Sequence, residues 1–244
     1  QRPRPYVVRP PVGGPRAFGP GERFQFTFGL LGSAAQLFPY VVMAAQLLDQ
    51  SGLGRRVAQN DYRRGTVRVA EIAAVHPLSG ATEPLYQAGR AVVQAPGLPV
   101  RPEEVRERAA ALPTNRLTLH FRTPLRLTDD KRLVRQIALR PLIQRLMRRL
   151  DDLSRAYGDG PLQVDFQALL EAASRSRVTR DTTRWIDLAS YSSRQRMHTP
   201  IGGLVGSVTF EGDLGPLREL LLWGSLIHVG KNAVKGDGWY EIEG

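Results

Sequence analysis

The stretch NRLTLHFRTPLRL, residues 115–127, decides the fold of the second half of this chain. Apolar and polar side chains alternate along it, as they do in a β-strand that buries one face. An amphipathic helix is predicted to follow over residues 131–155, because leucines and an isoleucine recur there at helical spacing while arginines occupy other positions. The second half therefore opens with a β-α unit.

The segments after this unit complete an order of six main elements. Gly158 and Gly160 end the helix, and a second short helix is predicted over residues 165–174. The pattern then predicts strands at 182–192 and 204–212, a helix at 215–227 and a last strand at 238–243. With the short helix set aside, the order is β-α-β-β-α-β, the plan of ferredoxin-like folds, which RNA-recognition folds share.

The first half of the chain repeats the last four elements of this plan. Strands are predicted at 4–10, 23–31 and 64–75, and a helix at 34–50. In both halves a Phe-Thr-Phe or Val-Thr-Phe triplet precedes a helix, and a glycine-basic loop follows that helix, SGLGRR at 51–56 and HVGK at 228–231. The sequence thus predicts an α+β protein of tandem ferredoxin-like (RRM-like) domains, at 1–100 and 101–244.

The predicted first domain lacks the initial β-α element of the plan. This absence is expected to expose a sheet edge and part of the face of helix 34–50. Bare edges and apolar patches favour association, so a further segment or a partner subunit is expected to cover them.

Arginine supplies most of the positive charge. Lys and Arg number 34 against 23 Asp and Glu, which gives a net charge of +11, and the lysines are Lys131, Lys231 and Lys235 alone. The guanidinium group matches phosphate oxygens and stacks on bases. Nucleic acid is therefore the predicted partner, and an arginine bias inherited from GC-rich coding is the alternative explanation.

The composition also excludes several kinds of site and several classes of protein. The chain contains no cysteine, which excludes disulfides and thiolate metal sites, and no spacing of His, Asp or Glu indicates a metal site, so no cofactor is predicted. The sequence shows no signal peptide and no apolar run long enough to span a bilayer. A soluble cytoplasmic protein without a membrane partner is expected.

The chain resembles the CRISPR-associated endoribonucleases of the RAMP superfamily, which cut repeat RNA into guide units. The resemblance rests on PYVVRPP (5–11), PGERFQFTFGLLGSAAQLFPYVV (20–42), LGRR (53–56), YSSRQ (191–195), GGLVGSVTFEGDL (202–214), and HVGK with the closing GWYEI (238–242). It implies tandem ferredoxin-like domains and metal-independent cleavage of a stem-loop repeat RNA. It also implies that the protein keeps the mature guide RNA (crRNA) bound and acts beside other CRISPR effector-complex subunits.

Two departures from the family pattern bear on this expectation. The glycine-rich ending is thinned at residues 232–235, where the family has small residues and another glycine. Many members carry the catalytic histidine in the first helix of the first domain, and this chain lacks that element. A non-catalytic RNA-binding or capping subunit of a CRISPR ribonucleoprotein is therefore the alternative function.

Cleavage of RNA without a metal needs a base for the ribose 2′-OH, an acid for the leaving 5′-oxygen and a cation for the phosphate. His228 and His198 are the predicted proton-transfer residues, and Lys231 is the predicted cation. The alternative roles are a helix C-terminal cap for His228 and a solvated basic hairpin tip for His198. His120, in the middle of a strand, is expected to be structural.

The glycine-basic loops are predicted to bind the RNA backbone. Gly230, Gly236 and Gly238 would offer N–H groups, and Lys231 and Lys235 would offer cations. Further contacts are predicted from the turn between the strands at 182–192 and 204–212, at Arg194, Gln195 and Arg196. The first-half loop is predicted to contribute Arg55 and Arg56. If the two repeats pack side by side, the two loops would line one cleft. The arginines of helix 131–155 are expected to form a solvated face instead.

Overall fold

The computed structural model describes residues 2–14, 17–89, 95–192 and 197–244. The chain divides into two compact units. Unit 1 comprises residues 1–33 and 105–244, and unit 2 comprises residues 34–104. This grouping differs from the domains predicted at 1–100 and 101–244 because residues 1–33 associate with the second half. The two ferredoxin-like domains at 1–100 and 101–244 remain a prediction.

The described elements of unit 1 are mostly strands. They are β1 (Tyr6–Arg9), β2 (Thr27–Leu30), β5 (Arg116–Leu125), β6 (Thr128–Asp129), β7 (Arg132–Leu133), α4 (Leu139–Tyr157), α5 (Phe166–Arg175), β8 (Arg177–Asp181), β9 (Arg184–Ile186), β10 (Ala189–Ser192), β11 (Met197–Pro200), β12 (Gly203–Glu211), α6 (Arg218–Ile227) and β13 (Tyr240–Glu243). Unit 2 contains α1 (Phe38–Gln46), α2 (Leu48–Ser51), β3 (Glu71–Val75) and β4 (Thr82–Gln87), and α3 (Pro102–Ala110) crosses the boundary. The chain has an α+β fold.

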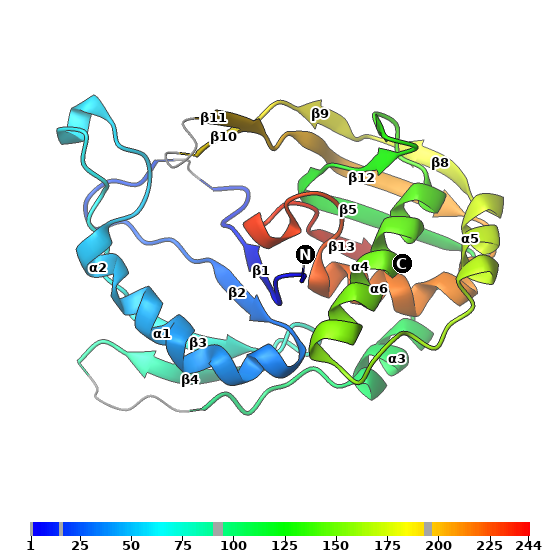
Figure 1. Ribbon diagram of the computed structural model, residues 1–244, viewed down its shortest axis with the longest axis horizontal. Helices are drawn as coiled ribbons and strands as arrows, with labels where there is room; N and C mark the ends of the chain where they lie inside the picture. Colours follow the sequence, from blue (N-terminus) through cyan, green and yellow to red (C-terminus); the bar gives the residue numbers. More distant parts are fainter. Residues whose placement is uncertain (1, 15–16, 90–94, 193–196) are drawn as a thin grey trace. The chain divides into compact units, whose positions relative to one another are not determined.

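Unit 1 is built on a five-stranded antiparallel sheet. Its order is β13-β5-β12-β8, and β9 also pairs with β12. Helices α4 and α6 lie on one face of this sheet (Figure 1). Along the chain, β5, α4, β8 with β9, β12, α6 and β13 follow one another in the predicted β-α-β-β-α-β order, apart from the short helix α5.

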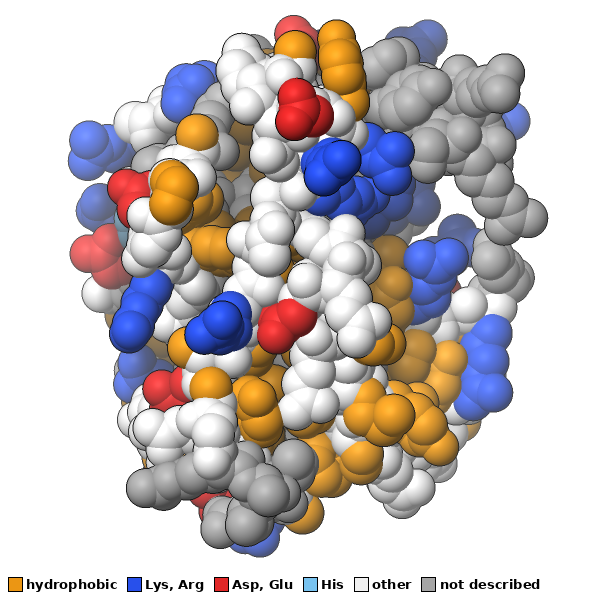
Figure 2. Space-filling model, turned by 90° about the vertical axis from the view of Figure 1, so that its left-hand side faces the viewer, with side chains coloured by type: hydrophobic (Ala, Val, Ile, Leu, Met, Phe, Trp, Pro, Cys, Tyr) orange, Lys and Arg blue, Asp and Glu red, His pale blue; other side chains and the backbone are white. Residues whose placement is uncertain are grey.

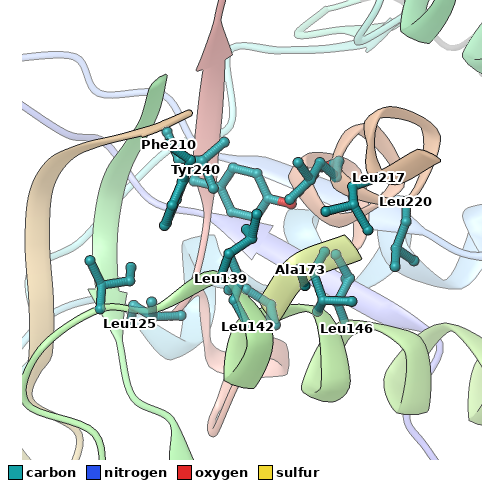
Figure 3. Packing of buried hydrophobic residues seen from close by; sticks show 14 of the residues in the cluster. Leu125, Leu139, Leu142, Leu146, Ala173, Phe210, Leu217, Leu220 and Tyr240 are labelled. Atoms are coloured by element: carbon teal, nitrogen blue, oxygen red, sulfur yellow. Dashed lines mark hydrogen bonds between the residues drawn. The ribbon is translucent and has the colours of Figure 1, made fainter. Parts of the chain in front are cut away.

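The last strand of the sheet, β13, is fixed by its Tyr240 side chain, which lies in the core between the sheet and the helices (Figure 3). Tyr240 is fully buried, and its hydroxyl donates to the carbonyl oxygen of Leu221 over 2.6 Å. Burial raises the pKa of Tyr240. A Cβ at Gly224 would overlap this hydroxyl and lie 2.6 Å from Cδ2 of Leu146, so glycine permits the close approach of α6 to β13. Both ends of the loop at 228–239 are therefore held by core packing.

Three segments differ from the predicted elements. Residues 131–138 are not helical: Asp130 and Lys131 have positive φ angles of 43° and 64° in the β6–β7 turn, and α4 begins only at Leu139. The predicted strand at 182–192 is divided, since β9 pairs with β12 while β10 pairs with β11. β8 was not predicted, because its residues RVTRD are all exposed and show no apolar alternation.

The strands of the first half form two separate hairpins. β1 pairs with β2 in unit 1, and β3 pairs with β4 in unit 2. The predicted exposure of the face of helix 34–50 is observed: Tyr40 is 68% exposed, and the other exposed large hydrophobic residues of this segment are Leu37, Met43 and Leu47. Figure 2 shows hydrophobic side chains at the surface on one face of the molecule. Within the described ranges, no helix combines the length and apolar character that crossing a bilayer requires.

Candidate nucleic-acid interface

A pocket of about 220 Å³ lies between helix α4 and the loop that follows α6. Its cationic lining residues come from three separated parts of the sequence and are Arg126, Arg145, Arg148, Arg149 and Lys231. Asp152 is the acidic residue in the described lining. We call this feature the basic pocket. A concentration of cations around one cavity favours binding of a phosphate group.

The glycines of the loop allow it to pack closely on neighbouring strands. Gly230 has a φ of 91°, and a Cβ there would lie 2.7 Å from the carbonyl oxygen of Arg126. Gly236 has a φ of 101°, and its Cβ would lie 2.9 Å from the carbonyl oxygen of Val8. Gly238 has a φ of 71°, and a Cβ there would overlap the carbonyl oxygen of Val229. The predicted loop glycines are thus required by its conformation.

Two of the backbone N–H groups predicted to face RNA are already occupied. The N–H of Gly238 donates to Pro124 O over 2.9 Å, and that of Gly236 donates to Ala233 O over 3.2 Å. The side chains of Lys231 and Lys235 are exposed. In this conformation the loop therefore offers a partner its lysine side chains rather than the N–H groups of these two glycines.

Two arginines of α4, a helix whose arginines are expected to form a solvated face, are held by backbone carbonyl oxygens beside the pocket. Arg145 donates to the carbonyl oxygen of Thr128 from Nε over 3.0 Å and from Nη2 over 2.6 Å. Arg149 donates from Nε to the carbonyl oxygen of Ile227 over 2.9 Å. Burial lowers the pKa of Arg149 to about 10, so this side chain stays charged at neutral pH. Arg148 is exposed. The pocket thus combines cations that are held by backbone carbonyls with two, Arg148 and Lys231, that are exposed to solvent.

His228 lies under this loop and is fully buried, with 0% of its surface exposed. Its ring stacks on Trp239 at 6.4 Å between centroids. Desolvation, followed by the nearby charges of Arg9 and Arg149, lowers its pKa to about 3, although the backbone of Ala233 and Asp237 offsets part of this shift. Neither ring nitrogen has a hydrogen-bond partner of good geometry in the described part of the chain. The proton transfer predicted for His228 would therefore require the loop to open.

The other predicted residues are in two further places. Arg194, Gln195 and Arg196 lie outside the described residues, and so does the side chain of His198, whose backbone pairs with that of Tyr191 in the β10–β11 hairpin. The remaining pair, Arg55 and Arg56, is exposed in unit 2 after Gly54, which has a φ of 90°. A cleft shared by the two glycine-basic loops would join the two units and stays a prediction.

Sequence reasoning missed Arg126 and Arg9. Arg126 donates from Nη1 to the carbonyl oxygen of Gly202 over 2.9 Å and lies 5.6 Å from the ring centroid of Trp185. Arg9 lies 5.2 Å from the ring centroid of Trp239 and donates to Ser225 O over 3.0 Å. Their partners are distant in the sequence, so no local pattern indicated either contact.

Metal ligation finds no support in the described ranges, where no group of three or more His, Asp and Glu side chains is placed to hold an ion.

Comparison with known proteins adds two family matches. A family model for the CRISPR-associated endoribonuclease Cas6 matches residues 119–240, and one described as an N-terminal domain matches residues 1–98. No curated protein matches the chain.

Solved structures share the fold. A Cas6 product complex has a TM-score of 0.61 at 18% identity, covering 98% of this chain and 82% of that chain. A Thermus thermophilus Cas6 has a TM-score of 0.54 at 15% identity, covering 98% and 79%. A chain of a Cas6-RT-Cas1–Cas2 complex has a TM-score of 0.60 at 13% identity, covering 98% of this chain but 24% of that one.

Proposed function

The chain belongs to the Cas6 family of CRISPR-associated endoribonucleases, and on this premise we propose that it binds CRISPR repeat stem-loop RNA and cleaves it without a metal ion. The resemblance seen in the sequence is thereby confirmed. The mature crRNA stays bound, and the chain acts as a subunit of a CRISPR effector complex. The observation that carries the proposal is the basic pocket, in which five cationic side chains surround one cavity beside the glycine-basic loop.

The proposed architecture is a tandem of ferredoxin-like domains. The β-α-β-β-α-β order and the strand order β13-β5-β12-β8 of unit 1 support this assignment for the second domain. For the first domain the support is the repeated sequence pattern. In this architecture the closing loop of the second domain carries Lys231 and Lys235.

The pocket suits a phosphodiester chain for electrostatic reasons. Arg145 and Arg149 are held by backbone carbonyls, so their charge is positioned before a ligand arrives. The exposed side chains of Arg148 and Lys231 are available to pair with phosphate oxygens. Each phosphate neutralised in this way releases counterions, which makes binding strongly dependent on salt.

The cleavage step follows from RNA chemistry. A general base takes the proton of the ribose 2′-OH as its oxygen attacks the neighbouring phosphorus, the bond from phosphorus to the 5′-oxygen breaks, and a 2′,3′-cyclic phosphate and a 5′-hydroxyl result. Lys231 is proposed to stabilise the phosphate, and His198 to protonate the leaving 5′-oxygen. His228 fits a proton-transfer role only with the loop open, since it is fully buried.

A second candidate function is a binding or capping subunit that cuts nothing. The observation in its favour is the complete burial of His228. This residue is the described histidine nearest in sequence to Lys231 of the basic pocket.

Incubation of the chain with the repeat RNA of its own locus in EDTA, followed by end-group analysis, tests the proposal. We expect a single cut with 2′,3′-cyclic phosphate and 5′-hydroxyl ends. A 2′-deoxy substitution at the cut should abolish cleavage and leave affinity unchanged. Tight binding without cleavage would establish the second candidate, and absence of specific binding would contradict both.

A further inference from the structure

The described lining of the basic pocket includes a carboxylate, that of Asp152. Asp152 lies on the same face of α4 as the lining residues Arg145, Arg148 and Arg149, because residues three and four positions apart are neighbours on a helix surface. The side chain of Asp152 is exposed. A carboxylate repels phosphate, so binding of a phosphodiester chain gives no reason for this residue among the cations.

The neighbouring acid in the sequence, Asp151, has a structural role that Asp152 lacks. Asp151 accepts from Nε of Arg155 over 2.7 Å and from the backbone N–H of Leu162 over 3.0 Å. These two hydrogen bonds lower the pKa of Asp151. Asp152 forms no ion pair or hydrogen bond with the residues that the structure describes. Its carboxylate is therefore available to accept hydrogen bonds from a ligand.

The pocket also has an apolar part, to which Pro3 and Leu127 contribute. Pro3 is held against α4, because its carbonyl oxygen accepts from the hydroxyl of Tyr157 over 2.8 Å, and the guanidinium of Arg2 lies 4.4 Å from the ring centroid of Tyr157. The volume of about 220 Å³ suits one nucleotide unit. Cavities that hold larger, drug-sized ligands measure about 300–1,000 Å³. Apolar surface, exposed cations and a free carboxylate match the base, phosphate and N–H groups of a nucleotide.

A carboxylate distinguishes guanine from the other three bases. An ionised carboxylate only accepts, and it has two oxygens. Guanine presents two adjacent donors, N1–H and the N2 amino group, so both oxygens can be used in a pair of parallel hydrogen bonds. Adenine and cytosine present one amino donor beside an acceptor nitrogen, and uracil presents one N–H between two carbonyls. The paired contact occupies the Watson–Crick edge, so the guanine must be unpaired.

We propose that the basic pocket binds one unpaired guanosine of the RNA and that Asp152 is its specificity-determining residue, an inference that rests on the proposed function. Asp152 accepts from N1–H and from the N2 amino group of the guanine. The exposed cations Arg148 and Lys231 pair with the phosphates on either side of this nucleotide. The cations therefore set the affinity for RNA, and the carboxylate selects the base in a single-stranded part of the repeat.

Binding of short single-stranded RNAs, measured by fluorescence anisotropy, tests this assignment. The probes are heptaribonucleotides of uridine that differ at the central base alone, which is guanine, hypoxanthine, adenine or uracil. Hypoxanthine keeps N1–H and lacks the N2 amino group, so it removes one of the two proposed hydrogen bonds. The wild-type chain should bind the guanine probe roughly 5–150-fold more tightly than the adenine probe, the range of a paired contact to a base. The hypoxanthine probe should lie between them.

The sign of the effect of Asp152→Asn is decisive. The amide has one acceptor and one donor, so it loses the bond to the N2 amino group and should bind the guanine probe more weakly. The same variant should bind the adenine and uracil probes slightly more tightly, because a negative charge near the phosphates is gone. Asp159→Asn is the matched control. It removes the same charge from an exposed residue just beyond the end of α4, outside the pocket lining, and should leave the guanine preference unchanged.

The outcomes separate this inference from the proposed function. Tighter binding of all four probes by Asp152→Asn, by one common factor, would show that the carboxylate only repels phosphate, and the inference would be wrong although RNA binding stands. Equal affinities of the wild-type chain for the guanine and hypoxanthine probes would overturn it without any variant. A guanine preference that Asp152→Asn abolishes, in a chain that neither binds nor cuts repeat RNA, would establish the guanosine site and contradict the proposed function.

Discussion

The backbone N–H of Lys231 donates to the carbonyl oxygen of Arg126 over 2.9 Å. This bond ties the glycine-basic loop to the chain just beyond the end of β5, so two cations from distant parts of the sequence lie at one pocket. Arg149 holds the start of the same loop through the carbonyl oxygen of Ile227. The loop is therefore hydrogen-bonded to the rest of unit 1 at both of these points.

The exposed cations of the basic pocket should control the salt dependence of RNA binding. For the double variant Arg148→Gln/Lys231→Gln we expect weaker binding and a shallower slope of log affinity against log salt. The slope should fall by roughly 0.7–0.9 for each phosphate that the variant no longer neutralises. Filter binding over a salt series measures both quantities. Arg140→Gln is the control, because Arg140 is exposed on the same helix outside the pocket, and an equal effect there would refute a localised site.

Alanine at Gly238 should destabilise the protein more than alanine at Gly160. Both residues have positive φ angles, 71° and 120°, so each substitution should cost roughly 1–3 kcal/mol of backbone strain. At Gly238 the new Cβ would also overlap the carbonyl oxygen of Val229, whereas the space around Gly160 is open to 4 Å. Urea unfolding gives both free energies, and only Gly238→Ala should weaken RNA binding. Equal stabilities would show that the loop relaxes freely.

Opposite pKa shifts at His228 and Asp237 should nearly cancel in the pH dependence of stability. Burial lowers the pKa of His228 from 6.5 to about 3, so between these values the unfolded chain binds the extra proton and stability rises with pH. Burial raises the pKa of Asp237 from 3.8 to about 6, so in that window the folded chain binds the extra proton and stability falls with pH. The two contributions oppose each other between pH 3.8 and about 6.

Single variants separate these contributions. Relative to the wild type, Asp237→Asn should gain up to about 1.4 kcal/mol of unfolding free energy per pH unit as the pH rises from 3.8 to about 6. His228→Asn should lose a similar amount per unit over the same range. Denaturant unfolding at several pH values gives the differences. Parallel curves for all three proteins would contradict the burial of these groups.

Cleavage kinetics should distinguish the roles of His198 and His228. His198→Ala is expected to slow cleavage by roughly 10²-fold or more while affinity stays constant, as removal of a proton donor does. His228→Asn is expected to reduce affinity and rate together, because it removes a ring packed against Trp239 beneath the loop. Single-turnover rates and binding constants for both variants provide the comparison. A reduced rate with unchanged affinity in His228→Asn would show that the loop opens during the reaction.

Local sequence was enough to predict most of the elements of unit 1. Alternation along 115–127 marks β5, and the helical stripe after it marks α4, because a strand or helix that buries one face imposes its own period on neighbouring residues. The glycines at 230 and 238 also stand out by type, since they permit positive φ angles and close backbone approach. The arginine excess indicated a polyanion partner before any contact was known.

The tertiary structure alone decided which of these residues act together. β8 pairs with β12 although its own residues show no strand pattern, because the ladder comes from a partner distant in the sequence. His228 is at the end of a helix beside lysines, yet core packing removes it from solvent, whereas His120 contacts two polar partners from neighbouring strands. Burial and side-chain partners depend on which strands and helices become neighbours in space. Periodicity along the chain does not indicate which elements those neighbours are.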